Sequence, residues 1–256
     1  MANDFILDRY EFLKGYEENS HCNKRHVAAL LNLNGRNYVG VNGDEYCSCK
    51  EKGLDFCARD KNYGLEFVTC PSLCAEGSAI LTALFYGVDS SEWTVKDARA
   101  FLENKIADKA LSRGILISTG FPCERCTSMI MDTGIGEVYF GQFKNEEHLP
   151  DSNVVVRHKD ALNIARMGYS NVNLHKMTIT RMDRCGKLYY EPKNIQADQD
   201  YEFFARKGMR KSAIDYFMEL LDPMEREIKK EMIHSVLKNK NPFQSAIPGL
   251  VVKPLL

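Results

Sequence analysis

The fold of this chain is decided by two short stretches, Cys74-Ala75-Glu76 and Pro122-Cys123-Glu124-Arg125-Cys126. Three cysteine thiolates can fix a tetrahedral zinc ion and leave its fourth position open to water. Zinc lowers the pKa of that water toward neutrality, so hydroxide becomes available at ordinary pH. Glu76 stands two residues from Cys74 and, as a carboxylate that is not a ligand, can move protons. The pattern therefore predicts zinc ligands at Cys74, Cys123 and Cys126, with Glu76 as the catalytic residue.

Two other interpretations of the cysteines have to be weighed. A Cys-x-x-Cys pair alone is also typical of a redox site or of half a structural zinc site. A closed structural zinc site needs four ligands, whereas this constellation offers three and an acid. Helices that begin at Cys74 and Cys123 would also favour the thiolate form. We therefore expect a reactive zinc site.

The two stretches fit the signature of zinc deaminases, in which His-x-Glu or Cys-x-Glu precedes Pro-Cys-x-x-Cys. Around them the chain resembles the deoxycytidylate (dCMP) deaminases of the cytidine/deoxycytidylate deaminase superfamily. The segments that carry the resemblance are Ser20 to Ala29, Gly40-Val41-Asn42-Gly43, Cys57-Ala58-Arg59, Cys70, Cys74 to Leu81, Phe121 to Cys126, and Met129 to Phe140. The sequence departs from the dCMP deaminases at Cys74, where they usually have His, and Thr127-Ser128-Met129 does not continue as in cytidine deaminases.

The pattern of apolar residues predicts an α/β fold. Strands are expected at 26–33, 37–41, 115–118, 136–140 and 172–177, and helices at 3–19, 76–86, 91–111, 127–133 and 160–167. Asn34-Gly35 is a hairpin signal between the first two strands. This order predicts a layered domain with one mixed central β-sheet flanked by helices, like that of the cytidine deaminases.

Two domains are expected along the chain. A zinc deaminase domain should occupy residues 1–180, with a helical insertion at about 88–113 that could cover the site, form an oligomer face or be surface decoration. Residues 181–256 should form a C-terminal helical extension and tail. Residues 181–205 are polar and are expected to be rich in loops, followed by helices within 212–238.

Composition narrows the class of protein. The chain has 256 residues and a formal net charge of −1, which argues against a protein that coats nucleic acid. Its nine cysteines could suggest secretion, but the first residues are charged and no signal peptide or membrane-spanning stretch is apparent. We expect a cytoplasmic protein whose cysteines are reduced and serve the metal and the core.

The resemblance implies further site residues. Asn42 matches the asparagine that contacts the substrate sugar, although a turn asparagine in a left-handed conformation explains it nearly as well. Phe121 could border the base or belong to the core, and Arg25, with Lys24, could meet a 5′-phosphate. Some dCMP deaminases hold a second, structural zinc ion, for which the candidates are Cys22, Cys49, Cys57 and Cys70. The alternative is that these cysteines pack as small apolar groups.

The reaction implied by the resemblance is the zinc-dependent hydrolytic deamination of a cytosine-type nucleotide, such as dCMP, to its uracil product with release of ammonia. The partner would be a small nucleotide or nucleoside, with no nucleic acid and no membrane, and the protein would be a homo-oligomer. Two alternatives stay open. One is a deaminase that acts on a base in RNA or DNA or on a specialised nucleoside, and the other is a zinc-binding module without catalysis, which would have no need of Glu76.

Overall fold

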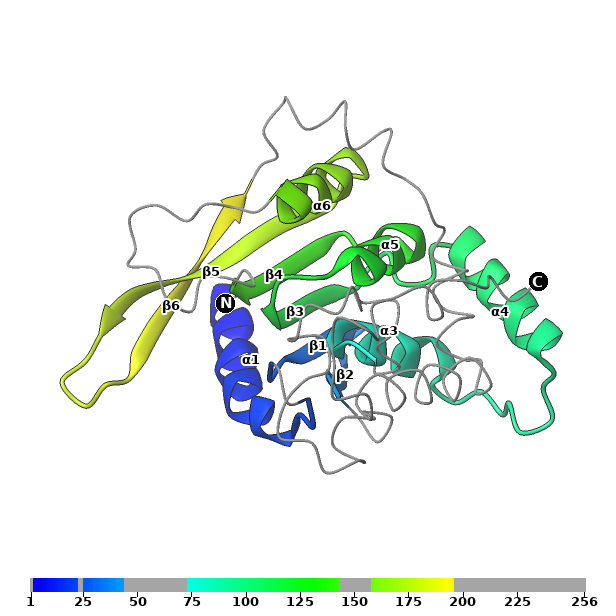
Figure 1. The fold of residues 1–256 in the computed structure, drawn as a ribbon, viewed down its shortest axis with the longest axis horizontal. Coiled ribbons are helices and arrows are strands. Elements are labelled where there is room, and N and C mark those ends of the chain that lie inside the picture. Colours follow the sequence, from blue (N-terminus) through cyan, green and yellow to red (C-terminus); the bar gives the residue numbers. More distant parts are fainter. Residues whose placement is uncertain (1, 23–24, 44–72, 143–157, 196–256) are drawn as a thin grey trace, which may run out of the picture.

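A six-stranded mixed sheet in the order β2-β1-β3-β4-β5-β6 forms the centre of the molecule (Figure 1). The computed structural model describes residues 2–22, 25–43, 73–142 and 158–195. The strands are β1 (Ala28–Leu33), β2 (Arg36–Val41), β3 (Ile115–Gly120), β4 (Glu137–Gln142), β5 (Asn173–Met182) and β6 (Leu188–Ile195). β3, β4 and β5 run parallel to one another, and the pairs β1–β2, β1–β3 and β5–β6 are antiparallel. The predicted mixed sheet is confirmed.

Helices cover both faces of this sheet (Figure 1). They are α1 (Ala2–Tyr16), followed by the short 3-10 turn η1 (Glu17–Asn19), then α3 (Ala75–Phe85), α4 (Val95–Ala107), α5 (Glu124–Thr133) and α6 (His158–Tyr169). α1 packs on one face through Ile6, Tyr10 and Leu13. The helices α3, α5 and α6 contribute to the larger core on the other face. The predicted α/β layering is confirmed.

The central strands are largely apolar, as expected for strands whose two faces are both covered. In β3, Ile117 belongs to the core under α1, whereas Leu116 belongs to the core under α3 and α5. This alternation follows from the two-residue period of a strand. It places Ser118 on the same face of β3 as Leu116, toward the helices that carry the cysteines.

Gly40 in β2 allows the strand to lie directly against the start of α3. A Cβ atom added at Gly40 would clash with the carbonyl oxygen of Ala75, and it would lie 2.6 Å from the backbone nitrogen of Ala79. Both contacts are with backbone, which cannot rotate away. The first glycine of Gly40-Val41-Asn42-Gly43 therefore sets the distance between the sheet and the helix that begins after Cys74.

We expect Gly40→Ala to lower the free energy of unfolding by about 1–3 kcal/mol, the usual cost of overpacking. Gly15→Ala is the matched control, because a Cβ there meets nothing within 4 Å. Since Gly15 lies in helix α1, that change should instead raise the free energy of unfolding by about 0.5–1 kcal/mol. Urea unfolding of both variants measures the difference. Equal effects of the two substitutions would contradict the close approach of β2 and α3.

The inserted segment forms a helix, as predicted. α4 begins with a capping box, in which the Thr94 side chain accepts from the Asp97 backbone nitrogen and the Asp97 carboxylate accepts from the Thr94 backbone nitrogen. Leu102 is fully buried in the larger core, and Phe101 and Ile106 pack against it. Much of the apolar face of α4 is therefore used inside this chain.

Residues 181–195 correct the expectation of a loop-rich segment. They complete β5 and form β6, joined by a turn in which the Asp183 side chain accepts from the backbone nitrogens of Cys185 and Lys187, both at 2.9 Å. The expectation was wrong because the far half of this hairpin projects beyond the core, so its strand residues are largely exposed and do not show the apolar alternation of a half-buried strand (Figure 1). The sheet thus continues past residue 180, and the predicted helices of 212–238 lie outside the described residues. Within the described ranges, no helix combines the length and apolarity that crossing a bilayer requires.

Candidate metal centre

The three predicted ligands converge at the starts of two helices. Cys74 is the N-cap of α3, Cys123 is the N-cap of α5, and Cys126 lies in the first turn of α5. The N-terminal ends of helices favour negative charge, which stabilises thiolates there. The two stretches are far apart in the sequence, but the sheet brings them together. α3 packs on β1 and β2, and α5 follows β3, which pairs with β1.

The distances between the sulfur atoms fit a single zinc ion. The Sγ atoms of Cys74 and Cys123 lie 3.5 Å apart, those of Cys123 and Cys126 lie 3.6 Å apart, and all three lie within 4.8 Å of one another. A disulfide would need about 2.05 Å. Three corners of a tetrahedron with metal–sulfur distances of about 2.3 Å are separated by about 3.8 Å. Among the residues that the structure describes, no further Cys, His, Asp or Glu joins this group, so the described donors leave a fourth position open.

The electrostatics of the cluster favour a cation. Side-chain hydrogen bonds with Cys126 and Cys74 hold the pKa of the Cys123 thiol well below its usual value. The same contacts with Cys123 raise the pKa values of Cys74 and Cys126 well above theirs. The three thiols thus influence one another strongly, and a divalent metal ion would stabilise all of them in the deprotonated form. The donor set of soft sulfur atoms suits zinc.

Glu76 lies beside this cluster in the first turn of α3. Its side chain is only 4% exposed, and its Oε2 atom lies 3.5 Å from the Sγ atom of Cys126. The Ser118 hydroxyl donates a hydrogen bond of 2.9 Å to the other oxygen, Oε1. Burial, and then the negative charge of Cys123, raise the pKa of Glu76. A buried carboxyl group with a raised pKa next to three sulfur atoms that could hold a metal ion is suited to accept and return protons.

The family model described as "Cytidine and deoxycytidylate deaminase zinc-binding region" matches residues 12–142, slightly more than half of the 256 residues. The chain belongs to the cytidine and deoxycytidylate deaminase family. The match includes all three cysteines and Glu76. It agrees with the resemblance found in the motifs, and the three cysteines that could hold a metal ion lie within the matched region.

Two solved structures of the dCMP deaminase from cyanophage S-TIM5 are similar to the chain. The apo form has 19% sequence identity and a TM-score of 0.38, and covers 67% of this chain and 97% of its own. The complex with dCMP and dUMP has 20% identity and a TM-score of 0.39, and covers 66% of this chain and 94% of its own. No curated protein matches the chain.

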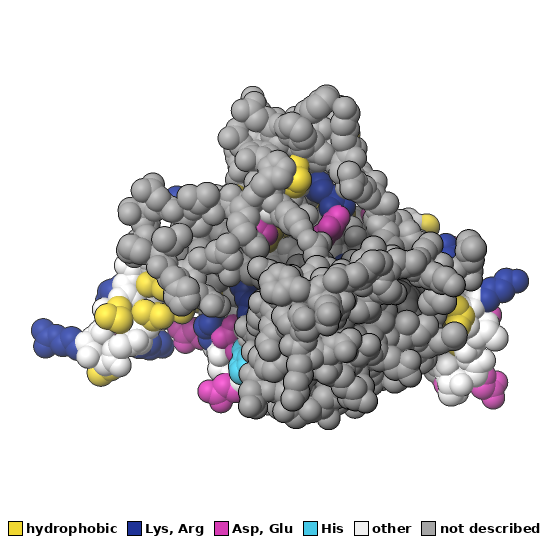
Figure 2. Space-filling model, in the orientation of Figure 1, with side chains coloured by type: hydrophobic (Ala, Val, Ile, Leu, Met, Phe, Trp, Pro, Cys, Tyr) yellow, Lys and Arg dark blue, Asp and Glu magenta, His cyan; other side chains and the backbone are white. Residues whose placement is uncertain are grey.

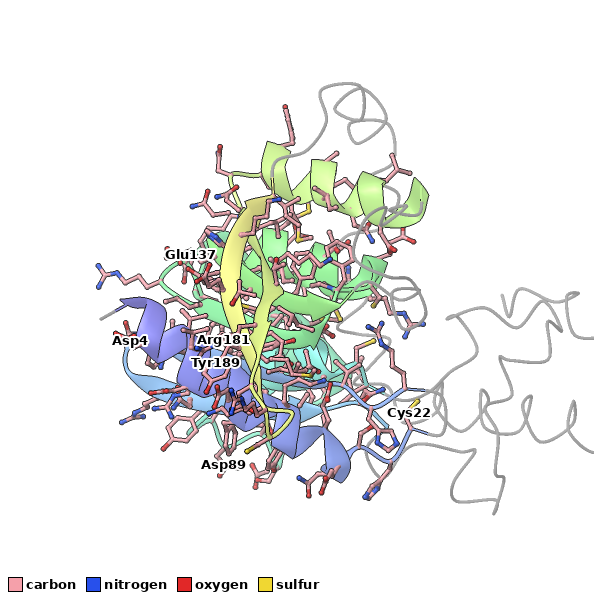
Figure 3. All side chains as sticks on the ribbon, turned by 90° about the vertical axis from the view of Figure 1, so that its left-hand side faces the viewer. Asp4, Cys22, Asp89, Glu137, Arg181 and Tyr189 are labelled. Atoms are coloured by element: carbon pink, nitrogen blue, oxygen red, sulfur yellow. The ribbon has the colours of Figure 1, made fainter. Side chains whose placement is uncertain are left out.

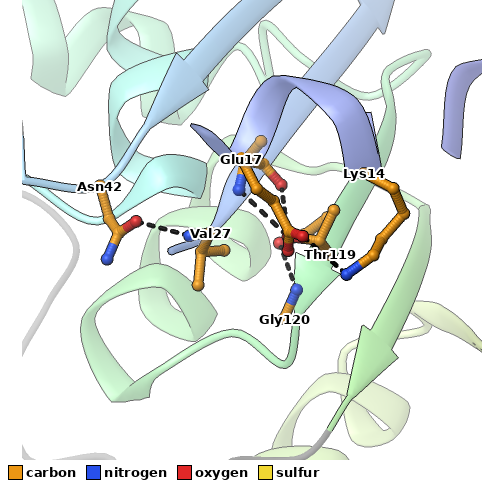
Figure 4. A network of polar contacts seen from close by, with 8 residues as sticks. Lys14, Glu17, Val27, Asn42, Thr119 and Gly120 are labelled. Carbon is orange, nitrogen blue, oxygen red and sulfur yellow. Dashed lines mark hydrogen bonds and ion pairs between the residues drawn. The ribbon is translucent and has the colours of Figure 1, made fainter. Parts of the chain in front are cut away.

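The Asn42 side chain makes hydrogen bonds to residues that precede β1. Its Oδ1 atom accepts from the Val27 backbone nitrogen at 2.7 Å (Figure 4). Oδ1 also accepts from the Ser20 hydroxyl at 2.7 Å, and the Nδ2 atom donates to the Arg25 carbonyl oxygen at 2.6 Å. Asn42 does not have a positive φ, so it is not the left-handed turn residue of the alternative interpretation. Its contact with a substrate sugar stays a prediction.

The Arg25 side chain lies at the end of β3 that leads to the metal loop. A Cβ atom built on Gly120 would lie 3.1 Å from a terminal nitrogen of the Arg25 guanidinium group. Gly120 stands three residues before Cys123, so Arg25 brings positive charge close to the zinc-binding loop. Lys24, the other phosphate candidate, lies outside the described residues.

Of the remaining candidate residues, the structure describes Phe121 and Cys22. Phe121 is 7% exposed and packs edge-on against Phe140 with ring centroids 4.8 Å apart, which is a core contact. Cys22 is buried and lies close to Gly43. A Cβ atom built on Gly43 would lie 2.7 Å from the Cβ atom of Cys22. Figure 3 shows the position of Cys22 in the domain. Cys49, Cys57 and Cys70 lie outside the described residues, so the second zinc stays a prediction.

Sequence reasoning missed three hydroxyl groups. Ser118 binds Glu76, and Ser20 binds Asn42. Thr119 bridges β3 to β1, accepting from the Ala28 nitrogen at 3.1 Å and donating to its carbonyl oxygen at 3.3 Å. For Ser118 and Thr119, the available signal was a pair of adjacent polar residues at the end of an otherwise apolar strand, since buried polar side chains need hydrogen-bond partners.

Proposed function

We propose that the protein is a zinc-dependent hydrolase that deaminates a cytosine-type nucleotide, such as dCMP, to the corresponding uracil nucleotide. The observation that carries the proposal is the buried Glu76 carboxyl group beside the cluster of Cys74, Cys123 and Cys126. Membership of the deaminase family supports it independently.

The cysteines would hold the metal ion, and Glu76 would handle the protons. When bound, zinc lowers the pKa of water at its open position and acts as a Lewis acid. Glu76 accepts a proton from the attacking water, delivers it to N3 of the cytosine ring and then assists departure of the C4 amino group. Water is consumed, and the products are the uracil nucleotide and ammonia.

A nucleotide as substrate is supported by charge near the site. Arg25 lies beside Gly120 at the entrance to the metal loop, and a guanidinium group is well suited to bind phosphate. The backbone carbonyl of Arg25 is held by Asn42. Asn42 therefore supports the loop that carries the proposed phosphate ligand, whether or not its own amide also meets the sugar.

The test is a panel of substrates given to the purified zinc-loaded protein. It comprises cytidine, deoxycytidine, CMP, dCMP, CTP and dCTP, with ammonia release and uracil products measured for each. We expect turnover of at least one nucleotide, with dCMP preferred over deoxycytidine. Preference for the nucleosides would argue against a phosphate role for Arg25, and no turnover of any member would refute the proposal.

The β5–β6 hairpin favours a second candidate, a base within a polynucleotide. Arg181, Arg184 and Lys187 are exposed on it, and the Arg181 guanidinium group lies 4.1 Å from the centre of the Tyr189 ring (Figure 3). Figure 2 shows basic and apolar side chains gathered on the projecting hairpin. Basic and aromatic side chains together suit a nucleic acid strand. A single-stranded oligonucleotide deaminated with a steep loss of activity at higher salt would favour this candidate over dCMP.

We also propose that the protein is a homo-oligomer. Ile179 is 49% exposed and Met182 66% exposed on the hairpin, and Val95 is 62% exposed at the start of α4. Large exposed apolar side chains are often covered by a partner. Light scattering at micromolar concentration should give at least twice the 29.2 kDa chain mass. A monomer under these conditions would contradict the expectation.

A further inference from the structure

Glu76 is held by a residue that the deaminase signature does not contain. We propose that Ser118 is a positioning residue that fixes the Glu76 carboxylate for proton transfer, an inference that rests on the proposed function. Ser118 is completely buried in β3, and its hydroxyl donates to Oε1 of Glu76 at 2.9 Å. A buried charged group is costly without such a donor, and a charge-assisted hydrogen bond is among the stronger ones.

The direction of the Ser118 proton is fixed by its own neighbour. The backbone nitrogen of Gly120 donates to the Ser118 oxygen at 3.3 Å. A hydroxyl group has one proton to donate, and the bond from Gly120 occupies one of the oxygen's acceptor sites. The hydroxyl proton is therefore directed at Glu76. Strand β3 holds the serine in this position.

The two oxygen atoms of the Glu76 carboxyl group have different neighbours. Oε1 accepts from the Ser118 hydroxyl at 2.9 Å, whereas Oε2 lies 3.5 Å from the Cys126 sulfur. Ser118 therefore holds one oxygen and leaves the other, on the side of the cysteines, for the reacting protons.

This geometry explains why a serine lies at the end of an apolar strand. In the core, an alanine at position 118 would pack as well and would need no hydrogen-bond partner. Because the hydroxyl is satisfied on both sides by Gly120 and Glu76, its loss would change the orientation of the acid more than the fold. Ser118 acts through Glu76 and does not itself contact the substrate.

The test is Ser118→Ala in the full-length zinc-loaded protein, assayed on the preferred nucleotide. We expect kcat to fall by about tenfold to a hundredfold, with KM and zinc content little changed. Ser118→Thr, which keeps the hydroxyl, should recover most of the loss. In a Glu76→Gln background, Ser118→Ala should cause little further loss, because both changes act on the same carboxylate. A crystal structure of Ser118→Ala should show Glu76 displaced or in more than one conformation.

Thr119→Val is the matched control. It removes the neighbouring buried hydroxyl, which bonds Ala28 on the opposite face of β3, so it should lower stability but leave kcat near the wild-type value. If the wild type is active, an unchanged kcat in Ser118→Ala would overturn the positioning role. An equal fall in kcat for Ser118→Ala and Thr119→Val would overturn it as well. A zinc-loaded wild type that deaminates no nucleotide would overturn the proposed function, and the role of Ser118 with it.

Discussion

Glu76→Gln is expected to abolish nearly all turnover while the zinc stays bound. General acid–base groups typically contribute about a hundredfold to ten-thousandfold, and Glu76 would serve several proton transfers, so the loss should reach the upper end of that range or exceed it. The amide keeps the size of the side chain and can still pair with the Ser118 hydroxyl. It cannot accept and return a proton. Ammonia release from dCMP, with zinc content measured in parallel, is the readout.

The control for this variant is Glu124→Gln. Glu124 stands between the two cysteines of the second stretch, but its side chain is 58% exposed and pairs with Arg166 at 3.8 Å. Neutralising it should leave turnover near the wild-type value. A binding module would have no turnover to lose, and a polynucleotide deaminase would show the same collapse only on its polynucleotide. Near-wild-type activity in Glu76→Gln with zinc in place would remove Glu76 from the mechanism.

The cluster of the three cysteines was predictable because much of it is set by short spacings along the sequence. Cys123 and Cys126 are brought together by one helical turn, and Cys74 and Glu76 by the start of another. The apolar runs around them predicted the strands that bring the two stretches side by side. The sheet was predictable for the same reason, since buried parallel strands are continuously apolar.

Contacts across the fold were not predictable in the same way. Ser118 and Glu76 are 42 residues apart, and nothing in either stretch records the register that makes them meet. The functional interpretation of Asn42 did not foresee that its amide would be used by Ser20 and Val27. Both partners are decided by how β2 and β3 pack with the segments before them.

The β5–β6 hairpin was missed because the period-two signal depends on one face being buried. Lys187 pairs with Glu11 of α1 at 3.4 Å, and Tyr190 packs on Tyr10 with ring centroids 4.9 Å apart. Tyr190 thus joins the side of the sheet covered by α1, while the turn at Asp183 projects. Because few residues of β6 contact the apolar core, its sequence resembles that of a loop.

Cys123→Ala is expected to release the zinc ion of the cluster and to reduce deamination to background. Cys123 has the central sulfur, in contact with both Cys74 and Cys126, so its removal leaves two ligands that no longer share a neighbour. Metal analysis should show a fall of one zinc per chain, and any zinc that remains would be the predicted second ion near Cys22. Cys185→Ala is the control, because that cysteine is exposed in the hairpin turn and its loss should change neither zinc content nor turnover. Deamination by zinc-free Cys123→Ala would show that the reaction does not depend on this cluster, and the assignment of Cys74, Cys123 and Cys126 as the catalytic zinc ligands would fail.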